Sequence, residues 1–433
     1  MKSGFRWVVI VLIAVATVIN YIDRNALAVM WPEISEDIGA TKEDYALLVT
    51  VFMIFYAIGQ SLFGRVFDWI GTRLGFVVSI GVWSLAIALH AAASSIAGFA
   101  AFRALLGLGE AGAWPGAVKA NAEWFPARER AFAQGIFNSG ASIGAIISAP
   151  LIAYLFLALD WKATFLLIGA LGVLWLVPWF FLYRAGPAAH PWVNEAERTH
   201  ILSDGTGTEA SAGAKPAYTP SVRQLLSHRQ SWGIIGARFF LDPVWWLFVS
   251  WLPIYLSETF GFDIKQIGLF GWVPFVGAMI GSLFGGWLSG RLIRAGWSVD
   301  RARKSVITLG GAIMLPALLL TSQAGDPLVA VLTIAVILFG FQIAIGNIQT
   351  LPADFFSGRT VGTLAGVSGT AAVAGTLITT WLVPVMTEIS YAPIFALGAA
   401  IVPLAILSIW FVSGRIQPVQ QPASGAAETS RSA

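Results

Sequence analysis

The chain has no cysteine and little charge. The missing cysteines exclude a disulfide framework and thiolate-bound metal. The four histidines, at positions 90, 190, 200 and 228, lack the close spacing of metal ligands, so no metal or cofactor is predicted. Charged residues form only 11% of the 433-residue chain, against about 25% in an average soluble domain. Such a chain cannot cover itself with a polar surface, so lipid is expected to be its main solvent.

Aromatic and other apolar residues are abundant in the sequence. The hydrophobic share is 57%, with 19 Trp and 29 Phe, and aromatic side chains collect at bilayer interfaces. The basic sequence pI of about 9.2 does not predict a nucleic-acid partner, because the basic residues sit in short loops between apolar runs. Lys2 and Arg6 precede an apolar run as in a signal peptide, but no small-residue cleavage site follows. We therefore expect an uncleaved first helix.

Twelve segments are long enough to cross a bilayer, which takes about 20 mostly apolar residues. They are too long for barrel strands and lack alternation, so helices are predicted. Breaks at Pro, Gly and charge clusters place them at 6–30, 44–69, 74–93, 96–120, 131–157, 161–184, 231–257, 266–293, 305–323, 327–354, 360–386 and 391–413. The predicted fold class is an all-α membrane protein of twelve transmembrane helices.

The basic residues predict the orientation of this bundle. Of the 26 Lys and Arg, three lie deep inside spans, away from the span ends. With a cytoplasmic N-terminus, twenty lie in cytoplasmic segments and three, Lys42, Lys162 and Lys265, in outer loops. A single miscounted helix would move every later loop to the other side of the membrane and remove this asymmetry, so the asymmetry supports the count of twelve helices. Both termini are predicted to be cytoplasmic, in a multi-pass protein of the bacterial inner membrane.

A polar stretch divides the chain into two sets of six helices. Six plus six with a long linker is typical of internally repeated transporters that work by alternating access. The predicted parts are an N-terminal bundle (1–184), a cytoplasmic linker (185–230), a C-terminal bundle (231–413) and a disordered cytoplasmic tail (414–433). We expect a monomer.

Small residues recur at four-residue spacing in three spans. Such faces bring helices close together, either as general bundle packing or as the seam between two moving halves. They are Gly140 and Gly144, then Gly277, Gly281 and Gly285, and finally Gly362 and Gly366. Gly107, Gly109 and Gly112 spell a dinucleotide-binding pattern, but it lies inside an apolar helix rather than a βαβ unit, so it predicts tight helix packing.

Six charged residues fall deep inside predicted spans, where each costs at least ~2.5–3.5 kcal/mol. They are Asp23, Arg24, Arg103, Glu110, Arg238 and Asp242. Structural ion pairs are one explanation, since Arg238 and Asp242 are four residues apart and Arg103 and Glu110 share a helix face. The other is a site in which Arg24 or Arg103 binds a carboxylate. Asp23 and Glu110 then become proton carriers, because a substrate that occupies the arginine would favour their protonation.

Uncharged polar side chains also recur within the spans. They suit a polyhydroxylated ligand and interhelical hydrogen bonds equally. They are Tyr21, Tyr56, Gln60 and Asn138 in the first half, and Gln342, Asn347, Gln349, Ser368 and Thr370 in the second. Trp245, Trp246, Trp251 and Trp272 could stack on a sugar ring, although most tryptophans here are expected at the membrane interface or in packing.

Residues 64–73, Gly-Arg-Val-Phe-Asp-Trp-Ile-Gly-Thr-Arg, resemble the signature loop between helices two and three of the major facilitator superfamily. Trp69 replaces the usual second charge. The resemblance implies that Asp68, Gly71 and Arg73 gate the cytoplasmic side.

Three further stretches resemble the anion:cation symporter family within it: residues 20–25, 103–111 and 123–130. The runs 124–144 and 229–239 are similar to bacterial hexuronate (glucuronate and galacturonate) transporters. The resemblance implies that Arg24 binds the substrate carboxylate with help from Arg103, while Asp23 and Glu110 handle protons.

The function predicted from the sequence is therefore proton-coupled import of a small organic anion, a hexuronate. Other substrates stay open: an aldonate such as galactonate, an unsaturated or keto-deoxy uronate, or an aromatic carboxylate. A non-transporting membrane sensor with a carrier fold is the alternative of another class. No catalytic constellation is present in the sequence, so an enzyme is not predicted.

Overall fold

The computed structural model describes residues 4–203, 220–262, 264–356, 360–388 and 390–419. Within these residues the regular structure is helical throughout, without strands. The N-terminal helices are α1 (Phe5–Ile38), α2 (Lys42–Leu89), the 3₁₀ turn His90–Ala92, α3 (Ile96–Glu110), α4 (Ala113–Trp124), α5 (Ala127–Ala158) and α6 (Trp161–Leu182). The short helices α7 (Glu195–Leu202) and α8 (Val222–Ser227) follow. The C-terminal helices are α9 (Arg229–Phe260), α10 (Ile264–Phe270), α11 (Val273–Arg294), α12 (Val299–Thr321), α13 (Pro327–Ile348), α14 (Leu351–Phe355), α15 (Val361–Met386) and α16 (Ala392–Leu407), which ends in the π-helical turn Ser408–Val412.

Eleven helical stretches in the described part of the chain are long and apolar enough to span a membrane. Their boundaries follow the predicted spans closely, except that the second and third spans share one helix label, α2, which is interrupted at Gly71. Three predicted spans are each divided into two helices: α3 and α4, α10 and α11, and α13 and α14. A fourth span corresponds to α16 and its π-helical turn. Helices α7 and α8 were not predicted, because they are too short and polar to stand out by hydropathy.

Helix α2 is a hairpin rather than one straight rod. Gly71 has φ 82° and ψ 166°, a conformation that interrupts the helix and that glycine adopts without a Cβ clash. The rings of Phe67 and Phe76, on opposite sides of this break, have centroids 5.0 Å apart. Nine residues of straight helix would separate them by about 13 Å. The chain therefore reverses at Gly71, inside the signature loop identified in the sequence.

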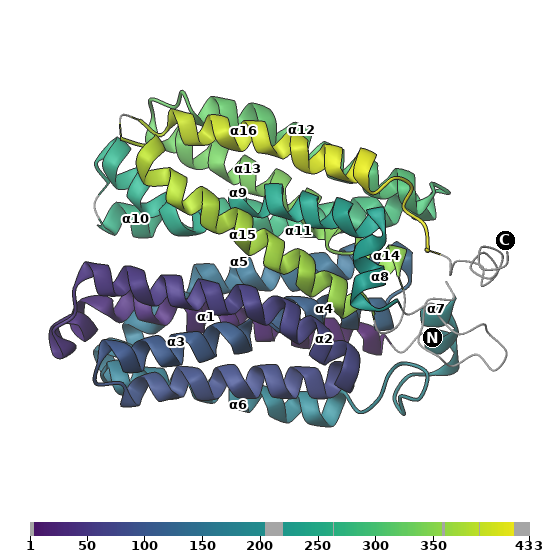
Figure 1. The fold of residues 1–433 in the computed structure, drawn as a ribbon, viewed down its shortest axis with the longest axis horizontal. Helices are drawn as coiled ribbons and strands as arrows, with labels where there is room; N and C mark the ends of the chain where they lie inside the picture. Colours follow the sequence, from purple (N-terminus) through teal and green to yellow (C-terminus); the bar gives the residue numbers. More distant parts are fainter. Residues whose placement is uncertain (1–3, 204–219, 263, 357–359, 389, 420–433) are drawn as a thin grey trace, which may run out of the picture.

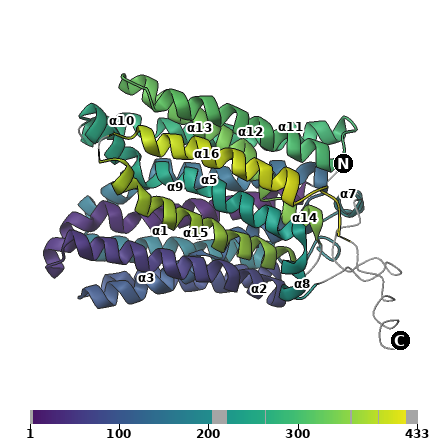
Figure 2. The ribbon, with the colours of Figure 1, turned by 45° about the horizontal axis from the view of Figure 1, so that its top comes forward.

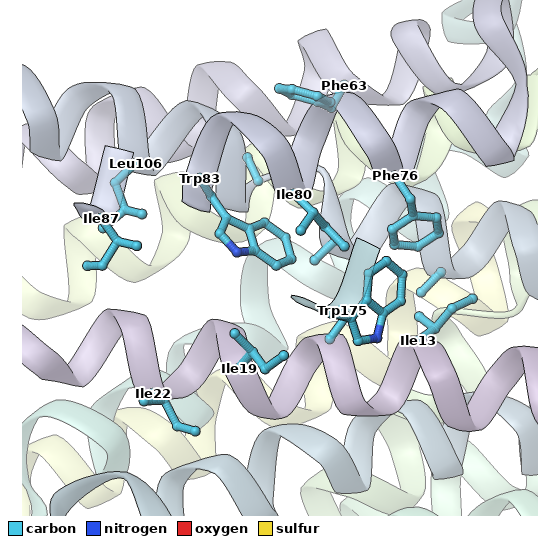
Figure 3. Close-up of a cluster of buried hydrophobic side chains, with 14 of the residues drawn as sticks. Ile13, Ile19, Ile22, Phe63, Phe76, Ile80, Trp83, Ile87, Leu106 and Trp175 are labelled. Carbon is cyan, nitrogen blue, oxygen red and sulfur yellow. The ribbon is translucent and has the colours of Figure 1, made fainter. Parts of the chain in front are cut away.

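The helices form two layers (Figure 1). Helices α1 to α6 make the N-terminal layer and α9 to α16 the C-terminal layer, each around its own buried apolar cluster. Figure 3 shows part of the first cluster, where Ile19 of α1, Trp83 of α2 and Trp175 of α6 converge. Val373 of α15 belongs to the first cluster, and Tyr21 and Ala141 to the second, so the layers also pack on each other.

Both ends of the described chain lie at one end of the bundle, together with α7, α8 and α14 (Figures 1 and 2). We call this the linker end. Helix α7 docks there through Glu197, whose buried carboxylate accepts hydrogen bonds from the Phe5 and Arg6 amides at 3.1 and 3.2 Å. It also pairs with the Arg6 guanidinium at 2.9 Å. The predicted linker and tail fall partly on residues 204–219 and 420–433, which lie outside the described residues; the domain boundaries stay a prediction.

The predicted glycine faces have different neighbours. Gly140 and Gly144 approach α1, and Gly277, Gly281 and Gly285 approach α13, so these two faces pack helices within one layer. Gly362 and Gly366 of α15 instead meet Gly64 and Gln60 of α2 across the layers. A second crossing joins Gly135 of α5 to Ser282 of α11 and Gly286 of α11 to Ala131 of α5. The seam role considered for all three faces thus fits α15 alone. Gly107, Gly109 and Gly112 pack against α2, which confirms tight helix packing.

Candidate functional site

A small cavity of about 50 Å³ lies between the two layers. Seven of the nine predicted substrate-binding residues line it: Tyr21, Arg24, Tyr56, Gln60, Asn138, Trp245 and Gln342. The lining also includes Trp114, Arg238, Asp242, Trp246, Phe341 and Gln349.

Arg24 is the charged group of the N-terminal wall. Its Nε and Nη2 donate to Oε2 of Glu110 at 3.2 and 2.9 Å, and Nη2 also lies 3.4 Å from the Asn20 amide oxygen. The guanidinium stacks 5.0–5.4 Å from four ring centroids, those of Tyr21, Phe52, Tyr56 and Trp246. Trp246 belongs to α9, so Arg24 contacts both layers. This aromatic cage holds the cation in place without consuming its hydrogen-bond donors.

Behind Arg24 lies a group of buried polar atoms that lack partners. Among the described residues, both carboxylate oxygens of Asp23, Oε1 of Glu110, and Nε and Nη2 of Arg103 are buried without a hydrogen bond. Asp23 and Glu110 are completely inaccessible to solvent. Unpaired buried groups of this kind are costly, and functional sites are where such costs are tolerated. Arg103 is near this group but does not line the cavity.

The C-terminal wall carries a second charged pair. Nε and Nη2 of Arg238 donate to the two carboxylate oxygens of Asp242 at 3.3 and 2.9 Å. The pairing expected from the four-residue spacing is confirmed. Both residues line the cavity, a role that the sequence left open.

Hydrogen bonds tie the two walls together. The indole of Trp245 donates to the Tyr21 hydroxyl at 3.2 Å. The side-chain oxygen of Gln349 accepts from the amides of Gln134 and Asn138 at 3.0 and 2.9 Å. These bonds join α1 and α5 of the N-terminal layer to α9 and the end of α13 in the C-terminal layer.

Ionic contacts close the linker end. Asp68 of α2 accepts hydrogen bonds from the amide and hydroxyl of Thr363 on α15, both at 2.6 Å, and pairs with Lys119 at 2.9 Å. Asp354 of α14 pairs with Arg130 at 3.0 Å and with Arg303 at 2.9 Å. Asp354 had no signal in the sequence, since it ends an otherwise ordinary apolar span.

The other predicted residues lie elsewhere. Arg73 donates to the Phe180 carbonyl at 3.0 Å and stacks on the Phe180 ring, so it caps α6 within the N-terminal layer. Asn347 bonds to Arg303, Gly285 and Ile343 near the linker end and does not line the cavity. Trp114 and Phe341, which do line it, carried no signal that separated them from other core aromatics.

Comparison with known proteins identifies the fold and family. Residues 13–378 match the family model described as Major Facilitator Superfamily. The chain is 33% identical to the hexuronate transporter of Escherichia coli (strain K12), over 95% of this chain and 94% of that one. It is 36% identical to the galacturonate transporter of Dickeya chrysanthemi, over 72% of this chain and 90% of that one.

Among solved structures, the proton:xylose symporter XylE is similar, with a TM-score of 0.75 at 14% identity over 96% of this chain and 98% of that one. The chain therefore belongs to the major facilitator superfamily, and it is a multi-pass inner-membrane transporter rather than an enzyme.

Proposed function

We propose that the chain imports a sugar-acid anion, a hexuronate, together with protons. The observation that carries this proposal is the Arg24 guanidinium, which faces a cavity between two helical layers and is held there by Glu110 and four aromatic rings. A guanidinium presents parallel donors that match a carboxylate. The relatives named as hexuronate and galacturonate transporters support the substrate class.

The cavity also suits the rest of such a substrate. Tyr56, Gln60, Asn138, Gln342 and Gln349 supply hydroxyl and amide groups at its surface. The side-chain oxygen of Gln60 has no partner among the described residues and is free to accept a bond from a sugar hydroxyl. Trp245 and Trp246 add flat apolar surfaces of the kind on which a sugar ring stacks.

Proton coupling follows if the Glu110 carboxylate and the substrate carboxylate compete for the Arg24 guanidinium. Glu110 occupies two donors of Arg24 in the absence of substrate. A substrate carboxylate that takes these donors leaves a fully buried Glu110 without its counter-charge, and a proton removes the cost of that bare charge. Asp23, buried without a partner among the described residues, is a second proton site. We keep Arg103 as a helper cation for these acids rather than a direct ligand.

The transport cycle requires the two layers to move against each other. We propose twelve transmembrane helices, counting the arms of α2 on either side of Gly71 as separate spans beside the other ten candidates among the described residues. With the linker end on the cytoplasmic side, Asp68–Thr363 and Asp354 with Arg130 and Arg303 form the inner gate. The structure is then closed to the cytoplasm. We propose a monomer in which residues 1–184 and 231–413 rock about the cavity.

Counterflow in proteoliposomes tests this function. Purified protein is loaded with unlabelled galacturonate, and the uptake of labelled galacturonate, glucuronate and galactonate is followed. Saturable counterflow of a uronate is expected, and in a separate experiment with empty vesicles an imposed pH gradient is expected to drive uronate accumulation that collapses with the gradient. Preference for galactonate would assign the carrier to aldonates. Binding of sugar acids without any counterflow would favour the sensor alternative and contradict transport.

A further inference from the structure

Arg238, Asp242 and Trp246 form one face of α9 that is turned to the cavity. They are spaced four residues apart, the repeat that stacks side chains on one side of a helix, and all three line the cavity. The Arg24 guanidinium lies 5.1 Å from the Trp246 ring centroid, at one end of this face. The other end carries the Arg238–Asp242 pair. A ligand bound to Arg24 and lying along α9 therefore extends toward Asp242.

The distances match a six-carbon acid. Asp242 and Trp246 are separated by four residues, about 6 Å along the helix axis. A chain of six carbons with bonds of about 1.5 Å spans roughly the same length when extended. A substrate whose carboxylate is bound by Arg24 at the level of Trp246 thus places its far carbon near the Asp242 carboxylate.

Asp242 keeps acceptor capacity in this position. Each of its oxygens accepts one hydrogen bond from Arg238, and a carboxylate oxygen has room for a second. Across the described residues, neither side chain makes a hydrogen bond outside the pair, and the two side chains are 8% and 11% exposed. Two donors of Arg238 are committed to Asp242, so the two charges of the pair offset each other while the Asp242 oxygens can still accept a hydrogen bond.

We propose that Asp242 makes the site select substrates with one carboxylate and an uncharged, hydroxyl-bearing far end. This inference rests on the proposed function. The Asp242 carboxylate accepts a hydrogen bond from the far hydroxyl of the substrate, and in a low-dielectric cavity it repels a second carboxylate at that place. Arg238 is a positioning residue that orients the Asp242 carboxylate through two hydrogen bonds.

Competition on the unaltered protein gives the first test. D-galacturonate, L-galactonate and galactarate can present the same hydroxyl configuration counted from the bound carboxylate, and galactarate alone has a carboxylate at both ends. We expect galactarate to compete with labelled galacturonate at least about tenfold less effectively than galactonate does, a difference of about 1.4 kcal/mol. Equal competition by galactarate and galactonate would overturn the proposal, and this measurement needs no variant.

Asp242→Asn gives the second test, since it removes the charge at nearly constant size. The galactarate-to-galacturonate affinity ratio is expected to rise at least about tenfold, because Arg238 becomes available to a second carboxylate. Glu258→Gln, which alters an exposed carboxylate on the same helix away from the cavity, is the matched control and leaves the ratio unchanged.

Different results contradict the proposed function and the role of Asp242. Absence of sugar-acid counterflow in the unaltered protein would remove the proposed function itself. An unchanged ratio in an Asp242→Asn protein that still binds galacturonate would remove only this inference. Arg238→Gln tests whether Arg238 acts only by orienting Asp242. This variant is expected to weaken galacturonate binding, while galactarate stays excluded because Asp242 is still present. Admission of galactarate by Arg238→Gln would contradict the role given to Asp242.

Discussion

Arg24 of α1 and Glu110 of α3, which are 86 residues apart in the chain, form an ion pair. Both hydrogen bonds from Arg24 go to the same oxygen of the Glu110 carboxylate, Oε2. The second oxygen of Glu110 is buried without a partner among the described residues. The pair is therefore incomplete on both sides, because Nη1 of Arg24 is also unbonded there. Such an arrangement suits an exchange of partners better than a permanent structural bridge, whose groups are normally satisfied.

Arg24→Ala is expected to lower galacturonate counterflow at least about 100-fold. The variant removes two charge-assisted hydrogen bonds to the substrate, each worth roughly 1.5–3 kcal/mol. Arg24→Lys keeps the charge but loses the planar fork of donors. Its counterflow rate is expected to lie between those of Arg24→Ala and the unaltered protein. Quenching of tryptophan fluorescence by galacturonate measures binding, since Trp245 and Trp246 line the cavity. Uptake by Arg24→Ala at the level of the unaltered protein would exclude Arg24 from the site.

Glu110→Gln is expected to abolish proton-driven accumulation and to retain exchange. The glutamine carbonyl still accepts a bond from Arg24, so binding survives, but the side chain no longer carries a proton. The comparison is uphill uptake driven by a pH gradient against counterflow without one. Asp23→Asn, measured in parallel, shows whether the second acid also contributes. Accumulation by Glu110→Gln at an undiminished ratio would exclude Glu110 as the main carrier.

The sequence predicted the charged residues of the site better than it predicted their partners. Arg238 and Asp242 lie one turn apart on one helix, so their spacing alone predicted the pair. Glu110 shares a helix face with Arg103, yet it bonds to Arg24, because the rotation of each helix in the bundle decides which faces meet. Asn347 appeared equivalent to Gln342 in sequence, but packing turns it toward Arg303. Hydropathy fixed the spans, whereas these contacts depend on long-range packing that no local pattern contains.

Asp354→Asn is expected to destabilise the closed inner gate. One carboxylate neutralises both Arg130 and Arg303, and all three side chains are nearly inaccessible to solvent. Removing one partner from a buried ion network costs about 3–5 kcal/mol. Thermal unfolding in detergent measures the loss. Glu195→Gln is the control, because its pair with Arg198 is exposed and such pairs contribute about 0–1 kcal/mol. Equal unfolding temperatures for both variants would contradict a stabilising role for the network.

Gly64→Ala is expected to prevent the inner gate from closing while leaving the protein folded. An added Cβ at Gly64 would overlap the Gly362 carbonyl oxygen and press on Gly366, both on α15 in the opposite layer. Backbone atoms cannot turn aside as a side chain does, so the layers have to separate at this point. Gly81→Ala on the same helix is the matched control, because nothing lies within 4 Å of its added Cβ.

A single thiol reports the state of this gate, since the chain has no cysteine of its own. Val118 is 4% exposed and packs against Val361 and Ala365 across the layers, so Val118→Cys places the thiol inside the closed gate. In inside-out vesicles, Gly64→Ala is expected to raise maleimide labelling of this thiol at least severalfold and to lower uptake. Gly81→Ala changes neither. Slow labelling in the Gly64→Ala background would mean that the gate closes despite the added methyl group, and the glycine contact between α2 and α15 would then not control closure.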